Sequence, residues 1–181
     1  MITRAQEVSL REMALAILAK AGAVIRDDER QAVVVSDFGL GDPARTGIET
    51  LTFFNTDRIS AKLIILGPRQ TCPEHWHPAV GEDPGKEEIM RVRWGLVYLY
   101  TEGPATPNPG GAPPAGREEW YTARYETVLR PGDQIRLPPG SIHWFQAGDE
   151  GAVIDDYATC SRDVLDRFTD PAVVRTTVIA D

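Results

Sequence analysis

The stretch that decides the fold is CPEHWHPAVGEDPGKEEIMRVRWG, residues 72–95. Its two histidines, His75 and His77, are one residue apart, so in an extended strand both side chains lie on the same face of the sheet. Glu88 follows after a turn-rich excursion, and a distant segment, PGDQIRLPPGSIH, ends at His143. Three imidazole nitrogens and one carboxylate oxygen can bind a divalent metal ion while positions for water or substrate stay open. The pattern therefore predicts a metal site.

The spacing around these residues supports that interpretation, although a single histidine in a strand is more often a hydrogen-bonded structural residue than a ligand. All three histidines of the chain belong to the set, and Gly95 comes seven positions after Glu88. The second segment places four residues at successive offsets of six, two and three: Gly132, Pro138, Gly140 and His143. These spacings resemble the two motifs of the cupin barrels.

Composition and charge exclude several classes of partner. The chain has 181 residues, of which 42% are hydrophobic and 25% charged, and its net charge is -8. Nucleic acids and anionic membrane surfaces attract basic proteins, so neither is expected as a partner. The sequence contains neither a run of about eighteen apolar residues nor a signal-peptide pattern. We therefore expect a cytoplasmic protein with a small-molecule ligand.

The two cysteines, Cys72 and Cys160, cannot make a disulfide framework, and both are predicted to be structural. Cys72 lies three positions before His75. An odd offset within a strand predicts that its side chain points to the opposite face, away from the metal.

Periodicity predicts an all-β fold with minor helices. Apolar residues at helical spacing indicate an amphipathic helix over residues 3–21, and Gly22 ends it. Short β-branched or aromatic runs between Pro/Gly turns predict strands at 32–36, 51–54, 61–66, 90–101 with a bend at Gly95, 120–129, 134–137, 143–146 and 152–157. The Pro/Gly-rich stretch 102–116 is predicted to be a surface loop, and a last short helix is expected over 162–168 with Ser161 as N-cap.

Many short strands at close intervals favour a double-stranded β-helix, a jelly-roll-like barrel of the cupin type, over alternating βαβ units. We expect one domain, residues 1–181. Its N-terminal helix covers residues 3–21, the metal-binding barrel about 50–160, and the C-terminal short helix and tail 161–181.

Longer motifs resemble a narrower family than the cupin barrels as a whole. They are HWHP at 75–78, GKEE at 85–88, RWGLVYLY at 93–100, LPPGSIHWFQAG at 137–148, and SRD followed by FTDP near the end. Over roughly residues 50–175 the chain resembles the metal-dependent D-lyxose isomerases, which are sugar ketol-isomerases built on a cupin barrel.

The resemblance implies that His75, His77, Glu88 and His143 hold a divalent metal, usually manganese. The excursion between His77 and Glu88 is longer than in most cupins, which leaves Glu87 as an alternative ligand. Glu88 keeps the cupin spacing to Gly95. The implied activity interconverts D-lyxose and D-xylulose, and also D-mannose and D-fructose, as free sugars. Cupins commonly pair, so a homodimer is expected.

Aldose–ketose isomerisation needs a base near carbon and a group that polarises the carbonyl. Lys86 is two residues before Glu88, so its side chain is predicted on the same face; its alternative is a solvated lysine at a loop end. Asp156 lies in the strand segment AVIDDY, where the resembling family carries an acidic residue. Lys86 and Asp156 are the predicted catalytic residues, and the sequence leaves open which of them acts on carbon. Arg162 and Asp163 are interpreted as either sugar contacts or helix caps.

Two competing functions use the same ligands. An iron-dependent cupin oxygenase would also bind metal through three histidines and a glutamate. A non-catalytic sugar-binding cupin would bind metal without turnover. Conversion of lyxose to xylulose under nitrogen would exclude the first, and turnover itself would exclude the second.

Overall fold

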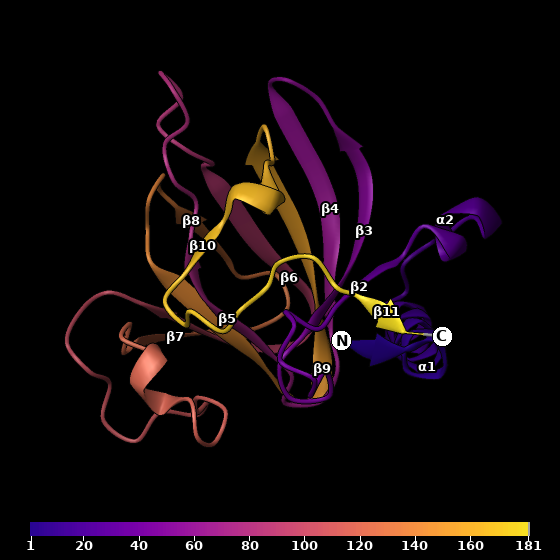
Figure 1. The fold of residues 1–181 in the computed structure, drawn as a ribbon, viewed down its shortest axis with the longest axis horizontal. Helices are drawn as coiled ribbons and strands as arrows, with labels where there is room; N and C mark the ends of the chain where they lie inside the picture. Colours follow the sequence, from indigo (N-terminus) through magenta and orange to yellow (C-terminus); the bar gives the residue numbers. More distant parts are fainter. Residues whose placement is uncertain (181) are drawn as a thin grey trace.

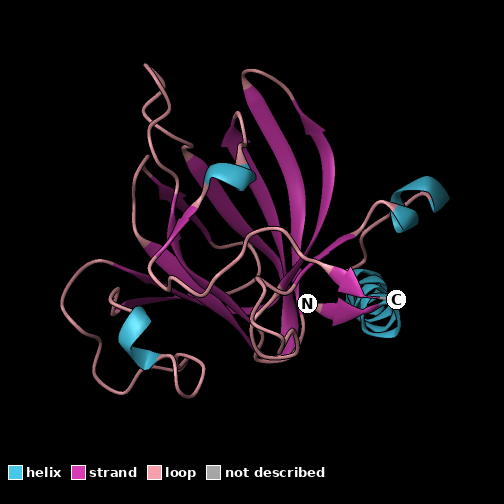
Figure 2. Cartoon of the chain, in the orientation of Figure 1, coloured by secondary structure: helices cyan, strands magenta, loops and turns pink. Residues whose placement is uncertain are grey.

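The computed structural model describes residues 1–180, and strands dominate it (Figure 2). The helices are α1 (Arg4–Lys20) and α2 (Asp27–Gln31), with 3-10 turns η1 (Glu118–Trp120) and η2 (Asp163–Leu165). The strands are β1 (Ile2–Thr3), β2 (Val34–Ser36), β3 (Ile48–Asn55), β4 (Ile59–Leu66), β5 (Thr71–Trp76), β6 (Glu88–Thr101), β7 (Tyr125–Leu129), β8 (Gln134–Leu137), β9 (His143–Thr159), β10 (Arg167–Phe168) and β11 (Ile179–Ala180).

The main sheet curls into a barrel around β9 (Figure 1). Its strand order is β10-β5-β9-β4-β3-β2, and β6 pairs with β7, β8 and β9. Because β9 pairs with β4, β5 and β6, this late strand joins three strands from the middle of the chain. Apolar side chains such as Met90, Leu99 and Ile154, each 0% exposed, fill the interior. The predicted all-β architecture with minor helices is confirmed.

Strand β9 corrects the prediction of two separate strands at 143–146 and 152–157, because it runs without interruption from His143 to Thr159. Its register against β6 shifts next to Gly95. Gly95 has a φ of 79°, and a Cβ there would lie 2.1 Å from the carbonyl oxygen of Gly151. Only glycine permits this close approach of the two strands, so the bend predicted at Gly95 is real.

Helix α1 has the ends that its sequence predicts. Thr3 accepts a hydrogen bond from the backbone N–H of Gln6, whose side chain accepts one from the Thr3 N–H, and Gly22 follows the helix with a φ of 65°. Its buried face, which includes Ile17 and Leu18, packs on the outer side of the sheet. The helix therefore covers part of the barrel wall.

Two predicted elements are wrong in extent. The strand predicted over 120–129 begins at Tyr125, because the preceding residues form η1 and an extended linker. The helix predicted over 162–168 is the single turn η2, preceded by Arg162 instead of a Ser161 cap, and β10 follows it. Arg167 and Phe168 pair with β5 at the edge of the sheet, so these two residues cannot continue a helix.

The Pro/Gly-rich stretch 102–116 is a loop, as predicted. No helix among the described residues, 1–180, is long and apolar enough to cross a membrane.

Candidate metal centre and cavity

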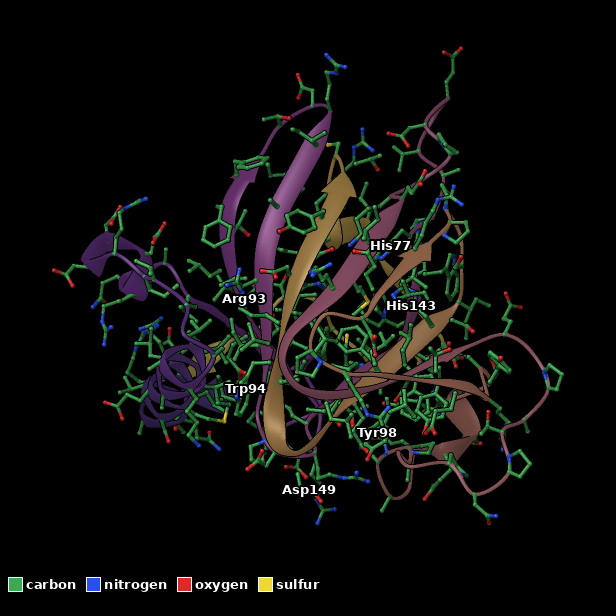
Figure 3. The ribbon with its side chains drawn as sticks, turned by 180° about the vertical axis from the view of Figure 1, so that it is seen from behind. His77, Arg93, Trp94, Tyr98, His143 and Asp149 are labelled. Atoms are coloured by element: carbon green, nitrogen blue, oxygen red, sulfur yellow. The ribbon has the colours of Figure 1, made fainter. Side chains whose placement is uncertain are left out.

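Three imidazoles converge at one end of the barrel. His75 lies in β5 directly opposite His143, the first residue of β9, and their ring centroids are 4.2 Å apart. His77 follows the end of β5, with centroids 5.1 Å from His75 and 5.4 Å from His143. One ring nitrogen of each lies within 4.8 Å of the other two. Figure 3 shows His77 and His143 at the same end of the molecule.

Hydrogen bonds assign the tautomer of all three rings. The Nδ1 atoms lie next to acceptors: the carbonyl oxygen of Pro73 at 2.8 Å for His75, Asp166 Oδ1 at 2.7 Å for His77, and the carbonyl oxygen of Ser141 at 3.0 Å for His143. A proton on each Nδ1 leaves the Nε2 lone pair free. Within residues 1–180, the buried Nε2 of His143 has no hydrogen-bond partner. A metal ion would use that lone pair.

Glu88 faces the same Nε2 atoms. Its Oε2 is 3.3 Å from Nε2 of His77 and 3.7 Å from Nε2 of His143, and its side chain is buried. Oxygen and nitrogen lone pairs that face each other need a cation between them, either a proton or a metal. Three imidazole nitrogens with a carboxylate oxygen suit divalent manganese, iron or zinc. The residues therefore fit a divalent ion.

The pKa shifts of His75 and His143 agree with neutral ligands, whereas that of His77 reflects its two acidic neighbours. Burial and the neighbouring imidazoles lower the pKa of His75 well below its usual value, and burial lowers the pKa of His143 to about 4. Burial also lowers the pKa of His77, but hydrogen bonds with Asp166 and Glu88 raise it above the ordinary value. Burial raises the pKa of Glu88, yet Lys86 and His77 bring it well below the usual range. Glu88 is therefore anionic at neutral pH.

Cys72 corrects the alternation argument. The register of β5 against β9 shifts between Cys72 and His75, so an irregularity replaces simple alternation. The Cys72 sulfur is 4.0 Å from His75 Nδ1, and both residues line the same cavity. Burial raises the pKa of the Cys72 thiol, which keeps it protonated and consistent with a structural role.

A buried ionic cluster adjoins the histidines. Lys86 Nζ lies 2.9 Å from Glu88 Oε1 and 4.0 Å from Asp163 Oδ1. Lys62, in β4, bridges two acids: its Nζ is 3.0 Å from Asp163 Oδ2 and 3.4 Å from Asp156 Oδ2. Lys86 is thus not a solvated lysine, because it is 7% exposed and lies beside the carboxylate predicted to bind metal.

The members of this cluster differ in protonation. Burial lowers the pKa of Lys86, but the carboxylates of Glu88, Asp156 and Asp163 raise it above the ordinary value. Burial and the Glu88 carboxylate raise the pKa of Asp156 to about 7, although Lys86 and Lys62 lower it. Lys86 is therefore a fixed cation, and Asp156 is the acid that can exchange a proton near neutral pH.

The cavity in front of the histidines is closed by the C-terminal part of the chain. His75 and His77 line it together with Lys86, Glu88, Asp163, Asp166, Phe168 and Arg175, and Asp156 lies behind Lys62, one of the lining residues. Arg175 reaches in from the tail, where it lies 3.5 Å from Asp163 Oδ2 and donates to Ser36 Oγ at 3.1 Å. Apolar side chains such as Phe38, Ile64 and Phe145 complete the wall, so the cavity combines charged groups with an apolar surface.

Sequence reasoning missed three of these residues. Lys62 had a signal, because a lysine within the apolar run AKLIIL is unusual, and it is 6% exposed. Asp166 and Arg175 had no such signal, since they lie outside the motifs. Asp163 had two interpretations, sugar contact and helix capping; it lines the cavity.

Residues next to the candidate ligands in the sequence point in different directions. Glu87 is at the surface and pairs with Arg136, so Glu88 is the glutamate that faces the histidines. Phe145 lines the cavity, whereas Trp144 is buried in a separate cluster where it stacks on Tyr100. Arg93 points away from the cavity and pairs with Asp155.

A curled antiparallel barrel with three clustered histidines beside a glutamate defines a barrel of the cupin type with a site that could hold a metal ion. The fold agrees with solved structures: L-ribose isomerase from Cellulomonas parahominis with L-ribose has a TM-score of 0.81 at 19% identity, covering 99% of this chain and 98% of that one. The L-ribose isomerase of Acinetobacter sp. DL28 with L-ribose has a TM-score of 0.78 at 18% identity, with the same coverage.

Sequence comparison identifies the family. The chain is 45% identical to a D-lyxose/D-mannose isomerase of Thermosediminibacter oceani over 181 residues, the full length of both. It is 48% identical to the D-lyxose ketol-isomerase of Cohnella laeviribosi over 169 residues, 93% of each, and 46% identical to that of a Thermofilum species over 175 residues, 97% of each. No protein-family model matches the chain. The chain belongs to the D-lyxose isomerase family.

Proposed function

We propose that this protein is a metal-dependent aldose–ketose isomerase that interconverts D-lyxose and D-xylulose, and also D-mannose and D-fructose. Relatives at 45–48% identity are named for D-lyxose, and one of them also for D-mannose. The observation that carries the proposal is the set of three Nε2 lone pairs beside Glu88, with a fixed ammonium, Lys86, next to them. A free sugar is its partner, and the cytoplasm is its proposed location.

We assign the metal to His75, His77, Glu88 and His143, and propose manganese as the ion. A divalent ion held there supplies Lewis-acid polarisation of the sugar oxygens. Asp166 fixes the ring of His77 through the Nδ1 hydrogen bond of 2.7 Å, and backbone carbonyls fix the other two rings. The ligands are therefore held in place before an ion binds.

The proton transfers are assigned to Asp156 and Lys86. Asp156 accepts the proton from C2 of the open-chain aldose and returns it to C1, because its pKa of about 7 suits both directions, while the hydroxyl proton of the C2 oxygen passes to the C1 oxygen. Lys86 stays protonated and places its positive charge where negative charge develops on the sugar oxygens. Lys62 lies between Asp156 and the cavity, so it must move or relay the proton during the transfer.

The test uses metal-stripped protein, manganese added back, and a panel of aldoses assayed under nitrogen with detection of the ketose. We expect xylulose from lyxose only after manganese is restored. Oxygen uptake without ketose would instead indicate an oxygenase, and metal binding without turnover a binding protein.

Two neighbouring carboxylates provide a matched pair of variants for the same experiment. Glu88→Gln should weaken manganese binding by about 100-fold or more, because it removes an anionic ligand. Glu87→Gln, at the surface, should bind manganese like the parent. Equal binding by both variants would contradict the assignment of Glu88.

A further inference from the structure

The cavity in front of the histidines is small compared with a sugar. Its volume is about 30 Å³. A cavity of about 150 Å³ accommodates benzene, and an open-chain pentose has more heavy atoms than benzene. Side chains of the wall must therefore move when a sugar binds, and the size of those side chains limits which sugar fits.

The apolar residues of the wall differ in how firmly the fold holds them. Ile64 in β4 and Phe145 in β9 lie within long paired strands. Phe38 lies in the turn after β2, and Phe168 is the last residue of the two-residue strand β10. Segments with little regular pairing open at a lower free-energy cost than the middle of a sheet. An entering sugar therefore displaces these two rings more readily than the strand residues.

The rings of Phe168 and Phe38 form a row that starts at the metal centre. Phe168 pairs with His75 across β10 and β5, and the centroids of their rings are 5.7 Å apart. The centroid of the Phe38 ring lies 5.6 Å from that of Phe168, and the guanidinium of Arg175 lies 5.6 Å from the Phe38 centroid. A sugar held at the metal by the oxygens of C1 and C2 therefore has its remaining carbons within reach of this row.

The backbone holds Phe38 in an unusual conformation. Its φ is 51°, in the left-handed region that a bulky side chain rarely adopts. Two hydrogen bonds fix the turn: the Val174 N–H donates to the Phe38 carbonyl oxygen at 2.8 Å, and the Gly39 N–H donates to Asp37 Oδ1 at 3.1 Å. Strained residues of this kind cluster at ligand sites. Here the strained residue places an aromatic ring, 1% exposed, in the wall of the cavity.

An aromatic ring at this position discriminates by length. A hexose has one more carbon and one more hydroxyl than a pentose, and a hydroxyl that faces an aromatic ring loses its hydrogen bonds with water and gains none there. One additional carbon in a pocket of limited size changes kcat/KM by about 10-fold to 200-fold. The ring of Phe38 therefore disfavours the longer chain through both volume and desolvation.

We propose that Phe38 is a specificity-determining residue, whose ring limits the length of the aldose and favours five carbons over six. This inference rests on the proposed function, because it assumes an open-chain sugar bound at the metal. Phe168 lies between Phe38 and His75, so it is the second residue of the same wall.

The test compares the parent, Phe38→Leu and Phe54→Leu on D-lyxose, which has five carbons, and D-mannose, which has six. Phe54 is 46% exposed near the end of β3, so the same substitution there is the matched control. We expect Phe38→Leu to raise the ratio of kcat/KM for mannose to that for lyxose by about tenfold or more, because leucine leaves room for the additional carbon. Phe54→Leu should keep the ratio of the parent.

Binding of sugar alcohols separates this inference from the proposed function. D-arabinitol and D-mannitol are the open-chain products of reducing lyxose and mannose, and calorimetric titration of the manganese-loaded proteins measures their affinities without turnover. Phe38→Leu should shift the ratio of affinities toward mannitol. If the parent is inactive but prefers arabinitol, and Phe38→Leu removes that preference, the isomerase assignment fails and the role of Phe38 stands.

Circular dichroism melts establish that each variant is folded. Phe168→Leu replaces the neighbouring ring and should shift both ratios in the same direction, so it provides the test if Phe38→Leu does not fold. Lower stability with unchanged ratios would assign Phe38 to packing alone and overturn the proposal. An equal shift in Phe54→Leu overturns it as well, and so does a parent that neither converts the aldoses nor binds the alcohols.

Discussion

The two faces of strand β5 place buried polar and charged groups in opposite environments. Glu74 points away from the cavity and is 1% exposed; its carboxylate accepts hydrogen bonds from Thr122 Oγ1 at 2.8 Å, the Ala123 N–H at 2.7 Å and Thr169 Oγ1 at 2.8 Å. Its neighbour His75 points into the cavity, and near this end of β5 Nε2 of His143 and both oxygens of Asp156 lack hydrogen-bond partners among the residues that the structure describes.

This difference separates a structural acid from functional ones. Glu74 is surrounded by neutral donors that satisfy it fully, so it holds β5 to the segment after η1 and to the residue after β10. The acids of the cavity are surrounded by cations and by unpaired acceptors, an arrangement that stabilises the fold poorly without a further ion. At the histidine end of β5, the buried acceptors without donors therefore lie at or beside the proposed metal centre.

The largest expected effect is the loss of catalysis when Asp156, whose carboxylate lacks hydrogen-bond partners, is replaced. Asp156→Asn should lower kcat by about 100-fold to 10,000-fold, because an amide cannot accept the proton from carbon. Manganese binding should persist, since Asp156 is not among the proposed ligands. Steady-state kinetics with a metal titration measures both quantities.

The adjacent residue provides the control for Asp156. Asp155→Asn removes a carboxylate of the outer face, paired with Arg93, and should leave kcat within a few-fold of the parent. A comparable loss of kcat in both variants would show that the assignment to Asp156 is wrong.

Replacing Glu74, whose carboxylate is fully hydrogen-bonded, should lower stability instead of catalysis. Glu74→Ala leaves a buried N–H and two hydroxyls without their acceptor, which should lower the free energy of unfolding by about 3 kcal/mol. Denaturant titration measures this loss, and Glu82→Ala, on an exposed loop, is the control. Once folded, the variant should bind manganese like the parent. Weaker metal binding would mean that the two faces of β5 are not independent.

Glu49 is a third kind of buried acid, which has neither the donors of Glu74 nor the cations near the histidines. It is 0% exposed, and among the described residues its carboxylate accepts one hydrogen bond, from Gln70 Nε2 at 3.3 Å. Burial raises its pKa from 4.5 to about 8, although Gln70 lowers it. The folded state then holds a proton that the unfolded state has lost, so stability declines as pH rises from about 4.5 to about 8.

Glu49→Gln should therefore gain stability over the parent as pH rises. Between pH 5.5 and 7.5 the difference in free energy of unfolding should grow by about 2 kcal/mol, given about 1.4 kcal/mol per pH unit. Urea titrations at the two pH values measure it. An unchanged difference would mean that Glu49 ionises normally in the folded protein.

The smallest expected effect is on manganese affinity, through Asp166, whose carboxylate accepts a hydrogen bond from Nδ1 of His77. Asp166→Asn keeps an oxygen acceptor for Nδ1 of His77 but removes the charge, so manganese affinity should fall by about tenfold. Competition with a chelating dye measures it, with Asp149→Asn, whose side chain is 90% exposed, as the control. An unaltered affinity would place Asp166 in a purely structural role.

Sequence alone determined the centre of the candidate site. The pair His75 and His77, the spacing of Glu88 to Gly95, and the segment ending at His143 were sufficient to group these four side chains, because motif spacing reflects strand register. Local sequence also predicted the helix over residues 3–21 and the loop at 102–116, because capping residues decide where a helix ends and Pro/Gly content favours a loop.

Only the tertiary structure decided the surroundings of that centre. Asp166 is 89 residues from His77, and Asp163 is 101 residues from Lys62, separations that no local pattern encodes. Cys72 joined the cavity because a register shift breaks alternation in β5. A one-residue shift turns side chains to the other face of a sheet, and pairing with distant strands, not the local sequence, sets where that shift occurs.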